Sequence, residues 1–182
     1  FARTSLVSTV CAAAFSLLAL DSARADLVWT PQSGWSIEGG SLSGLTGDEG
    51  RNALDMMNKA RADEEKGSFH AAGKTYEKVA KRYPNSIYSP EALYRAGQSF
   101  LQRKQYFVAF QDFQGVLDRY PNTKRFNEII GQEYHIAASL LDGSRNRFFF
   151  GLIPGFQSRE RSLAYFEVVI QNAPYSDYAP LA

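Results

Sequence analysis

Cysteine and histidine are scarce in this sequence. There is one cysteine, Cys11, and there are two histidines, His70 and His135. A single thiol excludes an intramolecular disulfide and any zinc site built from cysteine pairs. A metal-binding or catalytic pair of histidines needs both rings within a few ångströms of each other and of a third group. We expect two structural histidines, no bound metal, no cofactor and no catalytic residue.

An excess of charge of one sign is also missing. The chain has 20 basic and 19 acidic residues, for a net charge of +1. Binding to nucleic acid through the phosphates requires a clustered basic face, which this balance does not provide. The glycines Gly39, Gly40 and Gly44 lack the strand-to-helix setting of a phosphate-binding loop. Nucleic acids and phosphate-bearing cofactors are therefore not expected among the ligands.

The longest apolar stretch, from Leu6 to Leu20, is shorter than the roughly 20 residues that a membrane-spanning helix needs. It follows Arg3 and ends in small residues up to Ala25, an order typical of a secretory signal peptide. We interpret residues 1–25 as a signal peptide, with an uncleaved anchor as the alternative. Ser8-Thr9-Val10 lacks the leucine and small residue of a lipobox, which argues against a lipid on Cys11.

What the sequence has in abundance is a repeated apolar pattern. Hydrophobic residues make up 45% of the chain, and three segments share one arrangement, at 69–86, 106–123 and 162–176. In each segment an aromatic residue stands eight positions before a proline and a valine five positions before it: Tyr76, Val79 and Pro84; Phe113, Val116 and Pro121; Phe166, Val169 and Pro174. Apolar residues at a period of 3.6 predict amphipathic helices, and each proline ends one. Tyr76, Phe113 and Phe166 are expected to be buried at equivalent places.

Each of these helices has a predicted partner before it. Ser89-Pro90-Glu91 provides an N-cap, a proline at the first position and an acid in the first turn. Pro84 and Pro121 are separated by about one tetratricopeptide period of roughly 34 residues. The pattern predicts an all-α tetratricopeptide-repeat solenoid over residues 48–182, with helices at 48–66, 69–83, 90–103, 106–120, 125–142 and 159–172. Because Pro174–Pro180 repeats the pattern of Pro84–Pro90, we expect a further repeat beyond Ala182.

Residues 26–47 are expected to form an extended lead-in to the solenoid. The segment is rich in glycine and serine, and it predicts at most one short strand, near residues 27–30. Trp29 and Trp35 are expected to pack on the first helix pair, because indole rings bury a large area. Thr46 and Glu49 have the spacing of a capping box and mark the start of the first helix.

An insertion separates the two helices of the third repeat. Gly143 is expected to end the first helix and Ser158 to cap the second. Three adjacent aromatic residues between them, Phe148, Phe149 and Phe150, cannot all face one core. At least one of them should contact either another repeat or a partner. The flanking arginines either steer an acidic partner or remain in solvent: Arg145, Arg147, Arg159 and Arg161.

These features resemble the BamD family of outer-membrane assembly lipoproteins. The first two repeats end in Arg-Tyr-Pro-Asn, and the loop of the third repeat carries Phe149-Phe150-Gly151, as in that family. The similarity extends from residue 48 to 182. It implies a periplasmic subunit, at the outer membrane of a Gram-negative-type bacterium, of the machine that inserts β-barrel proteins. Its partners would be unfolded β-barrel substrates and the barrel-forming assembly subunit.

Two other functions are compatible with the same sequence. The first is a periplasmic repeat adaptor that coordinates other envelope or peptidoglycan machinery. The second is an accessory domain of an enzyme whose catalytic part lies beyond Ala182. A repeat fold does not by itself decide among these functions.

The first helix of each tetratricopeptide pair lines a groove that can receive a peptide. Counting back from the prolines predicts that this groove is lined by Met57, Arg61, Glu64, Tyr94, Gln98 and Leu101. Alternating apolar and polar groups would suit a strand of a β-barrel protein. The alternative is that these residues only pack between neighbouring repeats.

Overall fold

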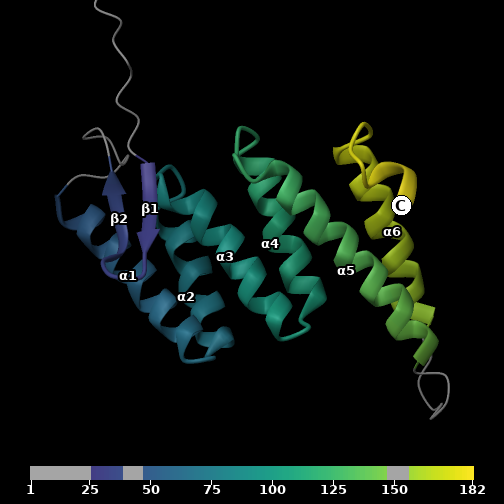
Figure 1. Ribbon diagram of the computed structural model, residues 1–182, viewed down its shortest axis with the longest axis horizontal. Coiled ribbons are helices and arrows are strands. Elements are labelled where there is room, and N and C mark those ends of the chain that lie inside the picture. Colours follow the sequence, from purple (N-terminus) through teal and green to yellow (C-terminus); the bar gives the residue numbers. More distant parts are fainter. Residues whose placement is uncertain (1–25, 39–46, 147–155) are drawn as a thin grey trace, which may run out of the picture.

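The computed structural model describes residues 26–38, 47–146 and 156–182 (Figure 1). The described residues form a short hairpin followed by α-helices packed in antiparallel pairs, which confirms the predicted helical-repeat fold. The elements are β1 (Asp26–Thr30), β2 (Gly34–Glu38), α1 (Gly47–Glu65), α2 (Phe69–Arg82), α3 (Tyr88–Gln102), α4 (Tyr106–Arg119), α5 (Phe126–Asn146) and α6 (Phe156–Asn172), with a 3-10 turn at Ala179–Leu181.

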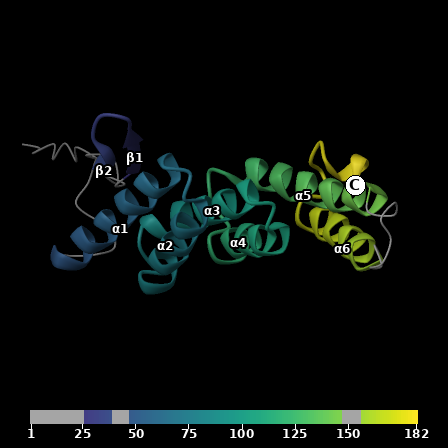
Figure 2. The same cartoon turned by 90° about the horizontal axis from the view of Figure 1, so that it is seen from below.

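The helices lie in two layers. Helices α1, α3 and α5 form one layer and α2, α4 and α6 the other, and the hairpin lies on the side of the first layer (Figure 2). Below, α1, α3 and α5 are called the first-layer helices. Consecutive helices alternate between the layers because the turns between them are short and reverse the chain direction. The first-layer helices therefore share one long face of the molecule.

The turns after α2 and α4 are built in a similar way. The backbone N–H of Tyr83 donates to Val79 O at 2.9 Å, and that of Tyr120 donates to Val116 O at 2.8 Å. The following prolines prevent both helices from continuing. Tyr120 also donates its hydroxyl to Pro84 O at 2.7 Å, which links the two turns. Tyr120 thus lies at the end of the second repeat and contacts the end of the first.

Three residues that were predicted to mark helix ends do not lie at those ends. Helix α3 begins at Tyr88, so Ser89 lies inside the first turn, where it is buried and donates its hydroxyl to Tyr83 O. Ser89 therefore fastens α3 to the end of α2 and is not the N-cap. Helix α5 continues past Gly143 to Asn146, and α6 begins at Phe156, two residues before Ser158. In both cases helical backbone continues through a residue that is common at helix ends.

The core runs through the middle of the helix stack. Tyr76 and Phe113 have no exposed surface and Phe166 retains 9%, which confirms their predicted burial. The helices approach closely at glycines: a Cβ atom on Gly97 would lie 2.8 Å from the Phe113 ring. A small residue on α3 thus makes room for an aromatic ring on α4. Gly73 and Phe100 repeat this arrangement between α2 and α3.

The lead-in is a two-stranded antiparallel hairpin, and the prediction of a single short strand was wrong. Trp29 lies opposite Trp35, and Gly34 closes the turn with a φ of +70°, which glycine adopts at little cost. Trp35 is buried, and its backbone N–H donates to Asn58 Oδ1 on α1 at 2.6 Å. Trp29 packs partly buried against the core. The predicted packing of both tryptophans on the first helix pair is confirmed.

Several sequence predictions fall outside the described residues. These are the signal peptide with Cys11, the glycines Gly39, Gly40 and Gly44, the cap residue Thr46, and the aromatic cluster Phe148, Phe149 and Phe150 with Arg147. None of the helices in the described ranges is both long enough and apolar enough to span a membrane.

Candidate functional site

A hollow of about 360 Å³ opens between α1 and α3 on the face of the first-layer helices. Three of the predicted groove residues, Arg61, Glu64 and Gln98, contribute to its wall. The other lining residues are Glu65, Phe69, Arg95, Ser99 and Gln102. Below, this hollow is called the α1–α3 groove. Because two arginines and two glutamates line it, its wall offers hydrogen-bond donors and acceptors side by side.

The other three predicted residues do not line the groove. Met57 has no exposed surface and belongs to the core, so its predicted place on the binding face is wrong. Tyr94 is also buried, with 3% of its surface exposed, and Leu101 packs partly buried against the core. These three residues support the helices that carry the groove.

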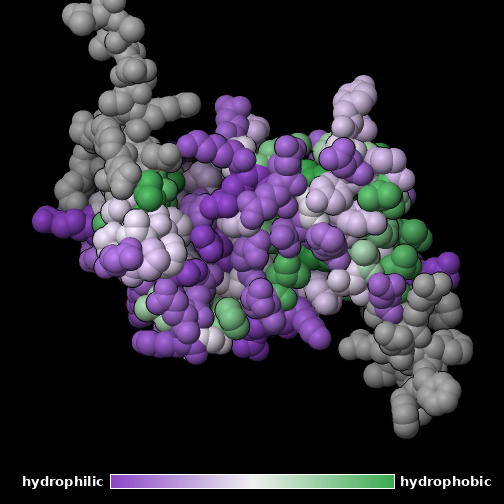
Figure 3. Space-filling view, in the orientation of Figure 1, coloured by the Kyte–Doolittle hydropathy of each residue, from purple (hydrophilic) through white to green (hydrophobic). Residues whose placement is uncertain are grey.

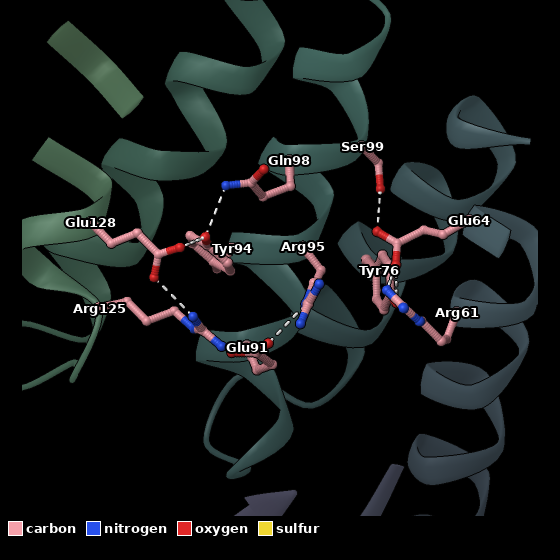
Figure 4. A network of polar contacts seen from close by, with 10 residues as sticks. All are labelled: Arg61, Glu64, Tyr76, Glu91, Tyr94, Arg95, Gln98, Ser99, Arg125 and Glu128. Carbon is pink, nitrogen blue, oxygen red and sulfur yellow. Dashed lines mark hydrogen bonds and ion pairs between the residues drawn. The ribbon is translucent and has the colours of Figure 1, made fainter. Parts of the chain in front are cut away.

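Glu64 is the centre of the polar network beneath the groove (Figure 4). Its carboxylate accepts hydrogen bonds from Arg61 at 3.0 Å, from the Tyr76 hydroxyl at 3.2 Å and from the Ser99 hydroxyl at 3.0 Å. These partners come from α1, α2 and α3, so one acid ties three helices together. Arg61 also stacks on Trp29, with its guanidinium carbon 4.2 Å from the ring centre. The groove wall is therefore held in place on the hairpin side as well.

A second network joins α3 to the start of α5 (Figure 4). Arg125 donates to both carboxylate oxygens of Glu91, at 2.7 and 3.1 Å, and to Glu128 at 2.9 Å. Tyr94 donates its hydroxyl to Glu128 and accepts a hydrogen bond from Gln98 at 2.8 Å. A bidentate arginine–carboxylate pair fixes geometry as well as distance. The face of the first-layer helices is therefore prearranged across the first two helix pairs and the start of the third.

The two tyrosines of these networks stay protonated near neutral pH. Burial raises the pKa of the Tyr76 and Tyr94 hydroxyls well above the ordinary value, and the neighbouring Glu64 and Glu128 raise it further. Both tyrosines therefore remain hydrogen-bond donors. Burial opposes ionisation of Glu128, but the hydrogen bonds from Tyr94 and Arg125 outweigh it and the pKa of Glu128 is lowered.

The surface seen from this side is mainly hydrophilic between the hairpin and α5 (Figure 3). Hydrophobic side chains gather instead at the end of the molecule where α6 lies. Leu163 and Ile170, on α6, are 54% and 39% exposed. Polar groups suited to recognition are thus concentrated on the first-layer helices, apart from this apolar end.

The tetratricopeptide-repeat family matches the chain in two places, at residues 56–86 and 91–123. These two segments are tetratricopeptide repeats. The first match covers the second half of α1 and all of α2, and the second covers most of α3 and all of α4. No curated protein matches the chain. The groove therefore lies between the first helices of two adjacent tetratricopeptide repeats.

Tetratricopeptide repeats are modules that bind other proteins and are typically not catalytic. In such repeats the first helices line the inner surface, which is where peptides bind. His70 and His135 are exposed on α2 and α5, away from the groove walls. Within the described ranges, no group of three histidine, cysteine or acidic side chains is placed to hold a metal ion. The site is suited to binding a polypeptide through hydrogen bonds and ion pairs.

Sequence reasoning missed five of the eight groove residues. Arg95 and Gln102 lie three positions before and four positions after Gln98, so helical periodicity could have found them. Ser99 follows Gln98 directly and is buried, because it turns toward Glu64 on the neighbouring helix. Phe69 has no such signal, because it enters the groove from the start of α2.

Proposed function

We propose that this protein is a non-enzymatic scaffold in the assembly of outer-membrane β-barrel proteins, acting at the periplasmic face of the outer membrane. The α1–α3 groove would hold segments of unfolded barrel proteins. Repeats nearer the C-terminus, including the apolar end at α6, would dock the barrel-forming assembly subunit. The observation that carries the proposal is the groove itself, an open and prearranged polar surface on the first helices of two tetratricopeptide repeats.

The chemistry of the groove favours an unfolded segment as its ligand. Gln102 is exposed, and its side chain makes no hydrogen bond within the described part of the chain. Gln98 uses one amide N–H for Tyr94 and keeps its other groups for a ligand. A glutamine amide carries both a donor and an acceptor, as does each peptide unit of an extended chain. Two glutamines one helical turn apart can therefore hold polypeptide backbone whatever its sequence.

The cellular setting of the proposal depends on the sequence. The signal-peptide pattern at residues 1–25 supports export, and Phe149-Phe150-Gly151 supports a similarity to the BamD family. The groove wall is polar apart from Phe69, so it suits the backbone and the polar side chains of barrel strands, in which apolar and polar residues alternate. The runner-up function is a periplasmic adaptor for other envelope or peptidoglycan machinery, which would use the same groove for a different protein.

Replacing Gln98 and Gln102 together with alanine should weaken binding of a barrel-protein peptide at least tenfold. The expected loss is about 1.4 kcal/mol, which corresponds to one or two hydrogen bonds of ordinary net strength. The measurement is fluorescence anisotropy of a labelled synthetic peptide that carries the last strand of an outer-membrane barrel protein. Arg61 is left unchanged because it also stacks on Trp29.

The matched control replaces Gln111 and Gln171 with alanine, because both are exposed glutamines on helices of the other layer. This control should bind the peptide like the wild type. Equal binding by the groove variant, or a loss that follows a lower melting temperature, would contradict the groove assignment. A wild-type protein that does not bind barrel peptides would overturn the barrel-assembly function and favour the adaptor.

A further inference from the structure

The two edges of the β1–β2 hairpin are in different environments. The outer edge of β2 is covered by α1: Trp35 donates its backbone N–H to Asn58 Oδ1 at 2.6 Å, and its carbonyl accepts from Asn58 Nδ2 at 3.4 Å. Asn58 thus takes the place of a third strand on that side. Proteins commonly cover strand edges in this way, because open edges pair with other chains.

The outer edge of β1 has no such cover among the described residues. In an antiparallel pair, successive residues alternate between pointing their backbone groups at the partner strand and pointing them outward. Because both backbone groups of Trp35 point outward to Asn58, those of its partner Trp29 point outward on the opposite side. The same alternation places the N–H and C=O of Leu27 outward, and no hydrogen bond to another described residue satisfies either pair.

This open edge borders a second hollow on the same face of the molecule. Of the two strands, β1 is the one nearer α3 in both views (Figures 1 and 2). A hollow of about 480 Å³ lies beside it, walled by Leu27 and by the starts of α3 and α5. The remaining lining residues are Ile87, Pro90, Glu91, Thr123, Lys124, Arg125 and Glu128. A chain that pairs with β1 would therefore run over the prearranged Glu91–Arg125 pair.

We infer that the outer edge of β1 is a strand-addition site for an extended segment of another protein. The segment adds as a third strand, with its backbone bound to Leu27 and Trp29. The inference rests on the proposed function, since it gives the conformation in which an unfolded substrate binds beside the α1–α3 groove. Only an extended backbone can satisfy an open strand edge, which is why the ligand is a strand and not a helix.

The side chains around the edge indicate which strand fits. Leu27, Trp29 and Trp35 lie on one face of the hairpin and pack on the helices. Alternate residues of an added strand would continue this face over the apolar side chains of Ile87 and Pro90. The residues between them would lie on the other face of the hairpin, where Ser36 is partly exposed. The matching partner is therefore a segment of alternating apolar and polar residues.

A second copy of this protein is a poorer fit to the edge than an isolated segment. The edge borders a hollow whose far side is the α4–α5 connection at Thr123. A second hairpin would bring with it its own α1, held by Asn58, into the same space. An unfolded segment has no attached helices and enters freely.

The test uses proline to remove one outward N–H. Changing Leu27→Pro removes the outward N–H of that residue without removing a hydrogen bond within the hairpin. Changing Leu27→Ala removes the leucine side chain but keeps the N–H. With the barrel-strand peptide as probe, we expect at least tenfold weaker binding by Leu27→Pro and less than a threefold change for Leu27→Ala. Fluorescence of the two hairpin tryptophans, Trp29 and Trp35, verifies that the hairpin remains folded in both variants.

Hydrogen exchange supplies the second readout. In the wild type, the amide hydrogens of Leu27 and Trp29 should exchange at least tenfold more slowly when the peptide is bound. A peptide N-methylated along one edge should lose binding, whereas the same peptide methylated along its other edge should keep it. Equal loss for both methylated peptides would count against strand addition.

The outcomes separate this inference from the proposed function. If Leu27→Pro binds as well as Leu27→Ala while the Gln98 and Gln102 variant still binds weakly, the groove function stands and strand addition is wrong. If the wild type binds no barrel peptide, both fall. Protection of the Leu27 and Trp29 amides without peptide, together with concentration-dependent dimerisation, would overturn the inference in favour of a second copy.

Discussion

Replacing Phe113 with alanine is expected to lower the free energy of unfolding by about 3–5 kcal/mol, the range found for large core aromatic residues. Phe113 has no exposed surface and lies against Gly97 on α3. Its ring is also 5.9 Å from that of Tyr94, beneath the polar network of the first-layer helices. Removing the ring leaves a cavity between α3 and α4, and Gly97, which faces it, has no side chain that could fill it. Urea denaturation followed by circular dichroism measures the change.

The control is Phe107→Ala in the same helix. Phe107 is 51% exposed, so its loss should change stability by less than about 1 kcal/mol. If Phe113→Ala does not fold, the milder Phe113→Leu variant should still be less stable than the Phe107 variant. A cost for Phe113 no larger than that for Phe107 would contradict the packing of successive repeats described above.

Replacing Glu133 with glutamine is expected to stabilise the protein at alkaline pH. Glu133 is fully buried on α5; one carboxylate oxygen accepts from Gln114 at 2.7 Å, and the other has no partner among the described residues. Burial raises the pKa of Glu133 to about 8, with a smaller contribution from the charge of Asp118 and an opposing one from Gln114. The folded protein therefore holds a proton that the unfolded chain has already released.

The direction of the pH effect follows from that difference. A carboxyl whose pKa is raised on folding stabilises the protein fully below its unfolded pKa of about 4.3. This stability is lost as the pH rises to about 8, by about 1.4 kcal/mol per pH unit. Glu133→Gln removes this loss, and at pH 9 it should be more stable than the wild type by roughly 5 kcal/mol.

Urea denaturation between pH 5 and 9 provides the measurement, with Glu160→Gln as an exposed control. Asp112 should leave a residual pH dependence in the Glu133 variant. Burial, followed by the charge of Glu77, raises the pKa of Asp112 to about 8, against opposing contributions from Lys74 and Arg119. In the double variant Asp112→Asn, Glu133→Gln, the free energy of unfolding should change little over this pH range. If the free energy of unfolding of the wild type does not fall toward alkaline pH, neither acid is buried as described.

The helix pairs could be predicted because their signals are local and repeated. Tyr76, Phe113 and Phe166 precede their prolines at one spacing, and each turned out to be buried at the corresponding place. A proline ends a helix wherever it follows one, so the ends of α2 and α4 were close to the predicted ones. Gly143 does not end α5, because glycine permits the left-handed conformation of a helix cap but does not require it.

The hairpin and some of the groove residues, such as Phe69 and Ser99, could not be predicted because contacts distant in sequence determine them. Strand β2 is held by Asn58, which belongs to α1 and has no counterpart in the local pattern. Met57 was placed on the groove surface by counting along a helix. Periodicity identifies a helical face but does not distinguish the part that faces a neighbouring helix from the part that faces solvent. Arg125, at the start of the third helix pair, forms an ion pair with Glu91 in the second repeat. Neither local sequence contains a signal that predicts this pair.

Site-specific photo-crosslinking in cell envelopes tests the central claim most directly. A photoreactive amino acid is placed at Gln102 in the groove or at Gln111 on the opposite layer, in otherwise unchanged protein. We predict that illumination links position 102 to newly made β-barrel proteins, identified by mass spectrometry, and that position 111 gives no such products. Barrel proteins recovered equally from both positions, or from neither, would contradict a role of this groove in barrel assembly.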